Sequence, residues 1–579
     1  MKTFAYLLTL RNFLMLLLGV SFFSISQIAN AQEDSKDIKQ ETKGVLMEFP
    51  EDEYVPSLRE THATSPAYRY FTEDVMIVQV NVDNNGFNIV NDAANEPSIV
   101  YDPTNPDNIC IGWRQFDNIN NNFRQAGYGY TIDGGETWTF PGVIEPGIFR
   151  SDPVLRCDRD GNYYYNSLTS SGGEYWVNVF KSADAGETWE MGTFAQGGDK
   201  QWMSIDMTDG IGSGNIYEFW NGNYSICFPD NFTRSTDGNN SYESCSWIPG
   251  GPYWGTTMVS PDGILYMCGA EWGGFIVAKS TNAQDPDADV NWELTVSVSL
   301  GGEVIGFGGY QCPNPEGLLG QTIIAMDSSG GPGDGNIYLL CSVDSYTNSD
   351  PCDVRFTRST DAGYTWSPSI RINDDPGNNA YQWFGTMSVA PDGRIDVVWL
   401  DTRNSLGSVN SALFYTYSLD QGETWTPNVQ ISEIFDPHLG WPQQNKMGDY
   451  FDMYSDESGA HLAWAATFNG EQDVYYARIT PSYVGVDEKG RGSNVSLLES
   501  FPNPFKDQTT IRYNLVTKDF VSLKVYTMTG TEVATLVEET QEPGLHQFVF
   551  SGSGLESGVY YYKLQTGNSS VTKRFILLK

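Results

Sequence analysis

Short apolar and aromatic stretches recur between residues 86 and 480, and polar turns rich in Gly, Asp and Asn separate them. Strands and tight turns prefer such residues, whereas helices do not. Seven of the stretches begin in a related way and read as inner strands of a repeated unit. They cover residues 96–101, 152–155, 201–206, 256–263, 321–326, 385–393 and 449–453. The pattern predicts an all-β chain built from repeats.

A second repeat follows most of these strands. The pattern Ser/Thr-x-Asp-x-Gly-x-Thr-Trp occurs intact at Thr131, Ser182, Ser359 and Ser418. Degenerate copies begin at Ser235 and Ser280. An Asp side chain accepts backbone N–H groups about two residues ahead, and Gly adopts positive φ, so each copy predicts a turn between two strands. We expect structural roles for the aspartates of these turns, which are Asp133, Asp184, Asp237, Asp361 and Asp420.

These turns are Asp boxes, and residues 86–480 resemble the Asp-box (BNR repeat) β-propellers of the sialidase-like superfamily. The resemblance implies that the boxes lie on the outer rim, away from the substrate face. Seven strand starts favour seven blades, and the six blades of true sialidases stay open as an alternative. No box follows the seventh start, so residues 75–82, within an N-terminal segment 32–85, are the candidate strand that closes the ring.

The chain changes character after a polar linker at 481–496. Residues 497–579 contain short alternating strands that predict a small immunoglobulin-like β-sandwich. The opening Pro-Asn-Pro-Phe at 502–505, the strand Ser-Gly-Val-Tyr-Tyr-Tyr-Lys-Leu at 557–564 and the basic, apolar end resemble the type A sorting domain of the Bacteroidota type IX secretion system. That resemblance implies transit through the periplasm, export across the outer membrane and removal of the tail. An ordinary carbohydrate-binding sandwich is the alternative.

The N-terminus predicts export as well. Lys2 and Arg11 flank a short apolar stretch, and Ala-Asn-Ala at 29–31 fits a cleavage site, so residues 1–31 are a predicted signal peptide. We expect no transmembrane segment, because no later stretch has the ~18–20 apolar residues that a spanning helix needs. The protein is expected to be secreted or to lie on the outer-membrane surface.

The net charge restricts the classes of molecule that the chain can bind, and the cysteines suggest disulfides. The chain has 73 acidic and 33 basic residues, a net charge of −40, which disfavours nucleic acid as a partner. Four unpaired His residues argue against zinc. Eight Cys in an exported chain suggest disulfides, and Cys227–Cys245 and Cys341–Cys352 are candidate local bridges.

Acidic residues stand near the starts of the predicted inner strands. If Glu96, Asp152, Asp199 and Asp449 point to a common axis, a cation such as Ca²⁺ would relieve their repulsion. Capping of local turns is the alternative, and no cofactor is required. Glu96, Asp152, Asp449 and Tyr450 are also the candidate catalytic residues.

The candidate ligand-binding residues are Arg114, Arg403, Trp202, Trp254, Trp272 and Trp383, since aromatic platforms and guanidinium groups suit glycans. The sialidases hold the sugar carboxylate with three Arg, but here Glu96 stands where their first Arg is expected. Three functions stay open. We favour recognition of a glycan or surface polymer without catalysis, and the alternatives are a sialidase-like glycoside hydrolase and a structural surface protein.

Overall fold

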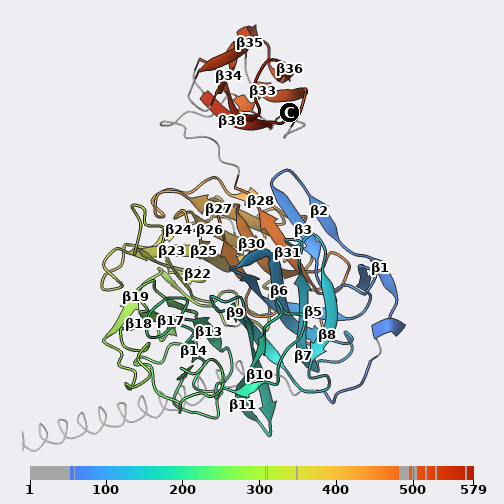
Figure 1. The fold of residues 1–579 in the computed structure, drawn as a ribbon. Helices are drawn as coiled ribbons and strands as arrows, with labels where there is room; N and C mark the ends of the chain where they lie inside the picture. Colours follow the sequence, from blue (N-terminus) through green and yellow to red (C-terminus); the bar gives the residue numbers. More distant parts are fainter. Residues whose placement is uncertain are drawn as a thin grey trace, which may run out of the picture. The chain divides into compact units, whose positions relative to one another are not determined.

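The computed structural model describes residues 52–57, 59–306, 308–309, 311–346, 350–377, 379–481, 495–497, 500, 505–515, 518–527, 531–567 and 570–579. The predicted signal peptide and most of the linker lie outside these residues. The chain divides into two compact units, Met1–Pro481 and Ser482–Lys579. The described residues contain strands and a single 3₁₀ turn, η1 (Arg59–Thr61), so the fold is all-β (Figure 1).

The first unit is a β-propeller of antiparallel sheets that follow one another along the chain (Figure 1). The first sheet has β5 (Ala93–Asp102), β6 (Asn105–Phe116), β7 (Arg124–Thr131) and β8 (Thr139–Ile144). The second has β9 (Ser151–Cys157), β10 (Tyr163–Ser171), β11 (Glu174–Ser182) and β12 (Thr193–Phe194). The third has β13 (Trp202–Ile205), β14 (Ile216–Phe219) and β15 (Phe232–Ser235). In each, the strand nearest the N-terminus is the innermost.

Three further sheets repeat this order. The fourth has β16 (Thr257–Val259), β17 (Leu265–Glu271), β18 (Gly274–Ser280) and β19 (Leu294–Val298). The fifth has β21 (Ile323–Met326), β22 (Ile337–Ser345), β23 (Asp353–Ser359) and β24 (Ile370–Arg371), with β20 (Gly302–Glu303) also on β22. The sixth has β25 (Gln382–Val389), β26 (Ile395–Asp401), β27 (Ala412–Ser418) and β28 (Val429–Gln430).

The last sheet of the described propeller joins both ends of the unit. It contains β29 (Asp452–Ser455), β30 (Ala460–Ala466) and β31 (Asp473–Ile479), followed outward by β3 (Val75–Gln79) and β2 (Arg69–Phe71). β3 pairs antiparallel with β31, with Ile77 opposite Ala477. A strand that precedes the first sheet therefore completes the seventh. β1 (Thr64–Pro66) pairs separately with β4 (Phe87–Ile89).

A left-handed residue marks the entry to most inner strands. The backbone φ is +54° at Glu96, +49° at Asp152, +55° at Lys200, +53° at Trp254 and +57° at Phe384. Non-glycine residues adopt such angles at a cost of about 1–3 kcal/mol. The ladder is interrupted at three of these residues, between Asn95 and Ser98, between Ser151 and Val154, and between Trp383 and Thr386. These bulges lie at one end of the inner strands and position the site described below.

The Asp boxes form the expected turns, but the Asp side chains accept hydrogen bonds from other residues than the sequence predicted. In the box at Ser418, Asp420 Oδ1 accepts from the backbone N of Thr424 at 2.8 Å, and Oδ2 accepts from the Thr424 hydroxyl at 2.6 Å. The carboxylate thus reaches four residues ahead, not two, because the intervening residues make the turn. Ser418 Oγ donates to Asp420 Oδ1 at 2.9 Å. Asp133, Asp184, Asp237 and Asp361 make the same contacts.

The second unit has two antiparallel sheets. One contains β32 (Val495–Leu497), β33 (Gln508–Leu515) and β36 (Gly544–Ser551). The other contains β35 (Glu532–Gln541), β34 (Asp519–Thr527), β37 (Gly558–Gln565) and β38 (Ser570–Leu577). Both sheets contribute to one apolar core, in which Tyr513, Leu523, Tyr562 and Phe575 are fully buried. A separate core of this kind is what an independent small domain requires.

Cys227 and Cys245 form a disulfide, as predicted. The predicted Cys341–Cys352 bridge is wrong, because both residues are buried free thiols. They lie on different elements, since Cys341 is inside β22 and faces Arg355 across the ladder, whereas Cys352 precedes β23. Among the described residues, no helix is long and apolar enough to cross a membrane.

Candidate functional site

The start of the inner strands holds a buried cluster of charged side chains. Lys200 Nζ lies 2.6 Å from Asp449 Oδ2, 3.1 Å from Asp152 Oδ2 and 3.6 Å from Asp199 Oδ1. Lys446 Nζ adds a second ammonium 2.9 Å from Asp449 Oδ2. The predicted convergence of these acidic residues is therefore present in the structure. Lys200, which sequence analysis missed, is the group on which they converge.

Glu96 completes the cluster from the first sheet. Its Oε2 lies 3.0 Å from Arg114 Nε, and both side chains are fully buried. Arg114 also donates to Asn95 Oδ1 at 2.8 Å and to Gln444 Oε1 at 3.2 Å. In this conformation Arg114 is thus buried against Glu96, Asn95 and Gln444, and its predicted role in ligand binding stays a prediction.

Two carboxyl groups of the cluster, Glu96 and Asp449, have opposite pKa shifts. Burial raises the pKa of Glu96 well above its usual range, against the opposing effect of Arg114. Burial also disfavours the charged form of Asp449, but Lys200, Lys446 and Arg114 outweigh it and hold the pKa of Asp449 well below its usual range. A proton on Glu96 leaves three carboxylates facing three cations, which balances the charge of the cluster. Tyr450 is buried beside it and donates to Pro153 O at 2.7 Å.

Two loop segments cover this cluster. Asn314 Nδ2 donates to Gly448 O at 2.9 Å, and Leu318 N donates to Asp449 Oδ1 at 2.8 Å. Asn445 N donates in turn to Glu316 Oε2 at 3.0 Å. Gly448 allows the close packing, because a Cβ there would lie 2.8 Å from Glu96 Cβ. The cluster is therefore sealed in this conformation.

Calcium is not needed to explain how these acids coexist. Within the described part of the chain, no three or more His, Cys, Asp or Glu side chains are placed to hold a metal ion. Lys200, Lys446 and Arg114 supply the positive charge that sequence analysis assigned to Ca²⁺. Since these groups come from three different sheets or their connecting loops, their convergence depends on the ring and is not encoded in any local spacing.

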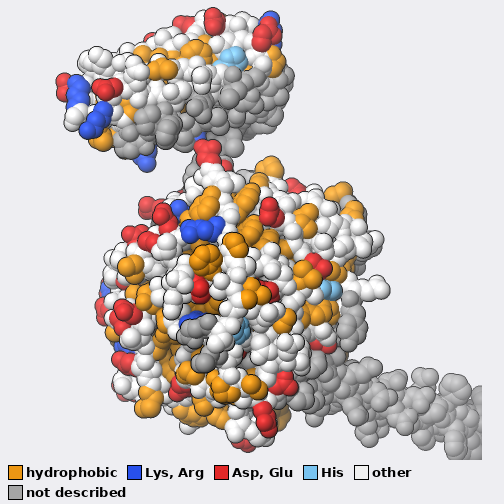
Figure 2. All heavy atoms as spheres, turned by 90° about the vertical axis from the view of Figure 1, so that its right-hand side faces the viewer, with side chains coloured by type: hydrophobic (Ala, Val, Ile, Leu, Met, Phe, Trp, Pro, Cys, Tyr) orange, Lys and Arg blue, Asp and Glu red, His pale blue; other side chains and the backbone are white. Residues whose placement is uncertain are grey.

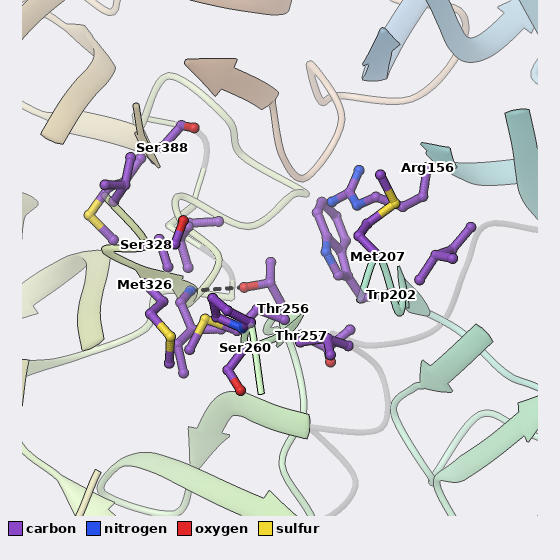
Figure 3. A pocket seen from close by; sticks show the side chains of 18 of the residues that line it. Arg156, Trp202, Met207, Thr256, Thr257, Ser260, Met326, Ser328 and Ser388 are labelled. Carbon is purple, nitrogen blue, oxygen red and sulfur yellow. Dashed lines mark hydrogen bonds between the residues drawn. The ribbon is translucent and has the colours of Figure 1, made fainter. Parts of the chain in front are cut away.

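The opposite end of the same inner strands holds a cavity of about 600 Å³ (Figure 3). β13 links the two regions, because Lys200 precedes the strand and Met207, on the cavity wall, follows it. The cavity reaches solvent beside Met207, which is 41% exposed. Hydroxyl groups line the wall, contributed by Thr208, Thr256, Thr257, Ser260, Ser328, Thr386 and Ser388.

One charged pair lies in the cavity wall. Arg156 Nη1 is 2.9 Å from Asp452 Oδ2, and the guanidinium carbon lies 5.2 Å from the centre of the Trp202 ring (Figure 3). Asp452 Oδ2 also accepts from Ser98 Oγ at 2.5 Å. On the far side, Thr256 Oγ1 accepts from Ile324 N at 3.0 Å. The remaining wall is apolar, with Met258, Met326, Met387 and Met453 from four different sheets.

The structure separates the other predicted ligand-binding residues. Arg403 Nη2 is 2.8 Å from Asp401 Oδ2 and Nη1 is 2.5 Å from Asp374 Oδ1, so this residue joins its own loop to the loop after β24. Trp383 is fully buried and donates to Ser411 Oγ. Trp202 is also buried, and its ring meets that of Tyr450 edge-on. Arg403 and Trp383 are thus held by protein partners away from the 600 Å³ cavity, whereas Trp202 lines that cavity. Their predicted roles in ligand binding stay predictions.

Two tryptophans remain accessible in different degrees. Trp272, at the tip of the β17–β18 hairpin, is 91% exposed. Trp254 is half-buried, and its ring lies edge-on to Tyr253. Neither lines the 600 Å³ cavity. On the face shown in Figure 2, acidic side chains are scattered over the surface with few Lys or Arg among them, as the net charge of −40 requires.

The second unit is identified by its match to a known family. Residues 499–578 match the family model of the secretion system C-terminal sorting domain. The predicted sorting domain is thereby confirmed, and it indicates export by type IX secretion to the cell surface or the extracellular space. The sorting domain accordingly has the secretion machinery as its partner. The chain has no significant match among curated proteins.

Solved structures show distant likenesses to the chain. A protein of unknown function from Dyadobacter fermentans is 12% identical, with 70% of this chain and 100% of that one covered and a TM-score of 0.38. PorZ, a surface component of the type IX secretion system of Porphyromonas gingivalis, is 12% identical (83% and 59% covered, TM-score 0.37). The α-L-arabinofuranosidase Arb93A of Fusarium graminearum is 11% identical (70% and 98% covered, TM-score 0.39).

Proposed function

We propose that this exported propeller binds a neutral, hydroxyl-rich ligand, a glycan or surface polymer, in the cavity at the Met207 end of its channel. The observation that carries the proposal is the cavity itself, whose volume of about 600 Å³ lies within the ~300–1,000 Å³ usual for ligand sites. Its hydroxyl groups can donate and accept hydrogen bonds, which suits a ligand that does both.

Charge in the cavity argues for a neutral ligand. Arg156 is already paired with Asp452, and the remaining carboxylate of the lining, Asp209, is paired with Arg159 at the rim. An anionic ligand would have to displace one of these carboxylates. Apolar contacts from Met258 and Met387 would then pack against the C–H faces of a sugar, because thioether chains adapt to irregular shapes.

Binding without catalysis is favoured over glycoside hydrolysis. Hydrolysis uses two carboxyl groups on either side of the substrate, one of them able to give up a proton. The acidic groups with opposite pKa shifts, Glu96 and Asp449, are instead buried, Glu96 against Gly448 and Asp449 against the backbone of Leu318. Those shifts are the one observation in favour of a hydrolase. Turnover of a neutral glycoside that is lost in both Glu96→Gln and Asp449→Asn, with folding retained, would establish that alternative.

A glycan array probed with the secreted protein tests the binding proposal. Ser388→Trp fills the cavity from β25, and we expect it to weaken binding of neutral oligosaccharides at least tenfold at an unchanged melting temperature. Ser171→Trp is the matched control, because Ser171 is exposed at the end of β10 and is absent from the cavity wall. Equal loss in both variants, unchanged binding in Ser388→Trp, or no binding by the parent protein would contradict the proposal.

A further inference from the structure

A second pocket lies beside the first sheet, where the N-terminal segment packs on the propeller. Its volume is about 350 Å³. Ser57, Arg59 and His62 line it from the segment, and Asp92 and Asp117 line it from the propeller. Phe140, Val143 and Pro146 form an apolar wall. The pocket thus combines a hydroxyl, an imidazole and an apolar surface within one small space.

Ser57 and His62 are hydrogen-bonded in a defined direction. Ser57 Oγ lies 2.8 Å from His62 Nε2, and His62 Nδ1 lies 3.3 Å from Val90 O. A carbonyl oxygen only accepts, so the Val90 contact requires the proton of neutral imidazole on Nδ1. Nε2 is then the acceptor, and the Ser57 hydroxyl donates to it. This is the relation between a serine nucleophile and its general base, with Val90 O orienting the ring.

The pocket also contains groups suited to a developing negative charge. Arg59 lies in the lining, with its guanidinium carbon 4.1 Å from the centre of the Phe140 ring. Asp92 is 2% exposed, and its Oδ2 accepts from Gln115 Nε2 at 3.0 Å. Among the described residues, Asp92 Oδ1 has no hydrogen-bond partner. Burial raises the pKa of Asp92 well above its usual range, which favours the protonated form of this carboxyl.

We propose that Ser57 and His62 form a nucleophilic site that hydrolyses neutral esters of a small acyl group. The Ser57 Oγ–H bond breaks as Oγ bonds to the acyl carbon, and His62 Nε2 takes the proton. His62 then gives this proton to the leaving alkoxide as the ester C–O bond breaks. Water next attacks the acyl-serine, its proton passes to His62 Nε2 and returns to Ser57 Oγ, and the carboxylic acid departs.

Neutral esters of small acyl groups are the class that fits the pocket. About 350 Å³ holds a short acyl chain against Phe140 and Val143 but excludes a large one. Asp117 faces the same space, and burial raises its pKa, with Gln125, His62 and Arg59 opposing the shift. In its ionised form Asp117 repels anionic substrates and stabilises the imidazolium that forms during the reaction.

Labelling with a fluorophosphonate tests the site without knowledge of the natural ester. We expect a covalent adduct on Ser57 of the folded full-length protein and none on the heat-denatured protein. His62→Ala should slow labelling about 100-fold or more, the usual contribution of a general base. Ser57→Ala should abolish both the adduct and the hydrolysis of p-nitrophenyl acetate.

Ser65→Ala is the matched control, because Ser65 lies on the same segment, in β1, and accepts from Asn88 Nδ2 at 3.0 Å. It should label like the parent protein. Melting temperatures of all variants separate a loss of the site from a loss of folding. Absence of an adduct on Ser57, or labelling of His62→Ala at the parental rate, would overturn the proposal.

Discussion

Lys200 Nζ lies 2.6 Å from Asp449 Oδ2, so one buried ammonium joins the entry of the third sheet to the entry of the seventh. The same ammonium contacts Asp152, at the entry of the second. Propeller sheets contact mainly their neighbours, so contacts across the axis hold together elements that otherwise touch only in sequence around the ring. The cluster is therefore a structural link across the axis as well as a candidate site.

Replacement of this ammonium should destabilise the propeller strongly. Lys200→Met leaves Asp152 and Asp449 buried beside an apolar group, and removal of one partner from a buried ionic network costs about 3–5 kcal/mol. Denaturant unfolding of the parent and variant measures the loss. Arg159→Met is the control, because Arg159 pairs at the surface with Asp209 and exposed pairs contribute about 0–1 kcal/mol. Equal losses in the two variants would contradict the central role of Lys200.

Glu218, on β14, should make stability depend on pH. Burial raises its pKa to about 8, with Asn166 and Tyr242 opposing the shift. The folded state then binds a proton that the unfolded chain releases near pH 4.5, so this contribution falls as pH rises from about 4.5 to 8. Glu218→Gln removes that loss.

The free energy of unfolding at pH 5 and pH 8.5 measures this effect. The variant should gain about 3–5 kcal/mol relative to the parent between the two values. Glu190→Gln, at an exposed position, should follow the parent at both. A constant difference between Glu218→Gln and the parent would show that Glu218 is ionised at neither or at both pH values.

The sequence was sufficient to predict features whose contacts all lie within one short segment. Asp420 contacts Ser418 and Thr424, all inside one eight-residue motif, so repeated spacing was enough to find the boxes. The convergence of Glu96, Asp152 and Asp449 followed from their common place before repeated strands. The direction of the Lys200 side chain did not, because it depends on a left-handed bulge with φ of +55° that the sequence marks only weakly.

Two other features could not be predicted from the sequence, because they exist only once the ring of sheets has formed. The cavity at Met207 lies at the ends of the inner strands opposite to the acidic starts, and no local pattern distinguishes an open end from a covered one. The two loop segments that cover the charged cluster meet where Asn314 donates to Gly448, and these residues are 134 positions apart in the chain. The sequence carries a weak signal for the left-handed residues of the inner strands. Each of them directly precedes Pro, Gly or Gln, and they are Glu96, Asp152, Lys200, Trp254 and Phe384.

Loss of an Asp-box carboxylate should affect stability and leave ligand binding intact. Asp420→Ala removes three hydrogen bonds, from Ser418 Oγ, Thr424 N and Thr424 Oγ1, and should cost about 1–2 kcal/mol. These bonds lower the pKa of Asp420 against burial, so the contribution is present above the unfolded pKa and disappears as pH falls through the folded one. Urea unfolding at pH 7 and glycan binding below the melting temperature test both parts. Weaker binding at unchanged stability would place this box at the ligand site.

The mature extracellular protein should lack residues 497–579. The sorting domain has its own core around Leu523 and Phe575, so its removal leaves the propeller core intact. Intact-mass measurement of the secreted protein gives the cleavage position, and the uncleaved full chain from a strain without the secretion system is the reference. A secreted mass that still includes Lys579 would contradict this expectation.

The protein should release no sialic acid from simple sialosides. Recognition of that sugar needs guanidinium groups free to meet its carboxylate with paired hydrogen bonds. Arg114 is fully buried and lies 3.0 Å from Glu96 Oε2, and Arg403 is held by Asp401 and Asp374.

Arg156, the guanidinium in the cavity wall, already contacts Asp452, so each of these three guanidinium groups has a carboxylate of the protein where the sugar acid would bind. Assays with a fluorogenic sialoside should therefore give the same rate for the parent, Arg114→Ala and Arg403→Ala, equal to the rate without protein. Turnover by the parent that disappears in both variants would mean that the ion pairs open to admit substrate, because only then could these two residues hold its carboxylate.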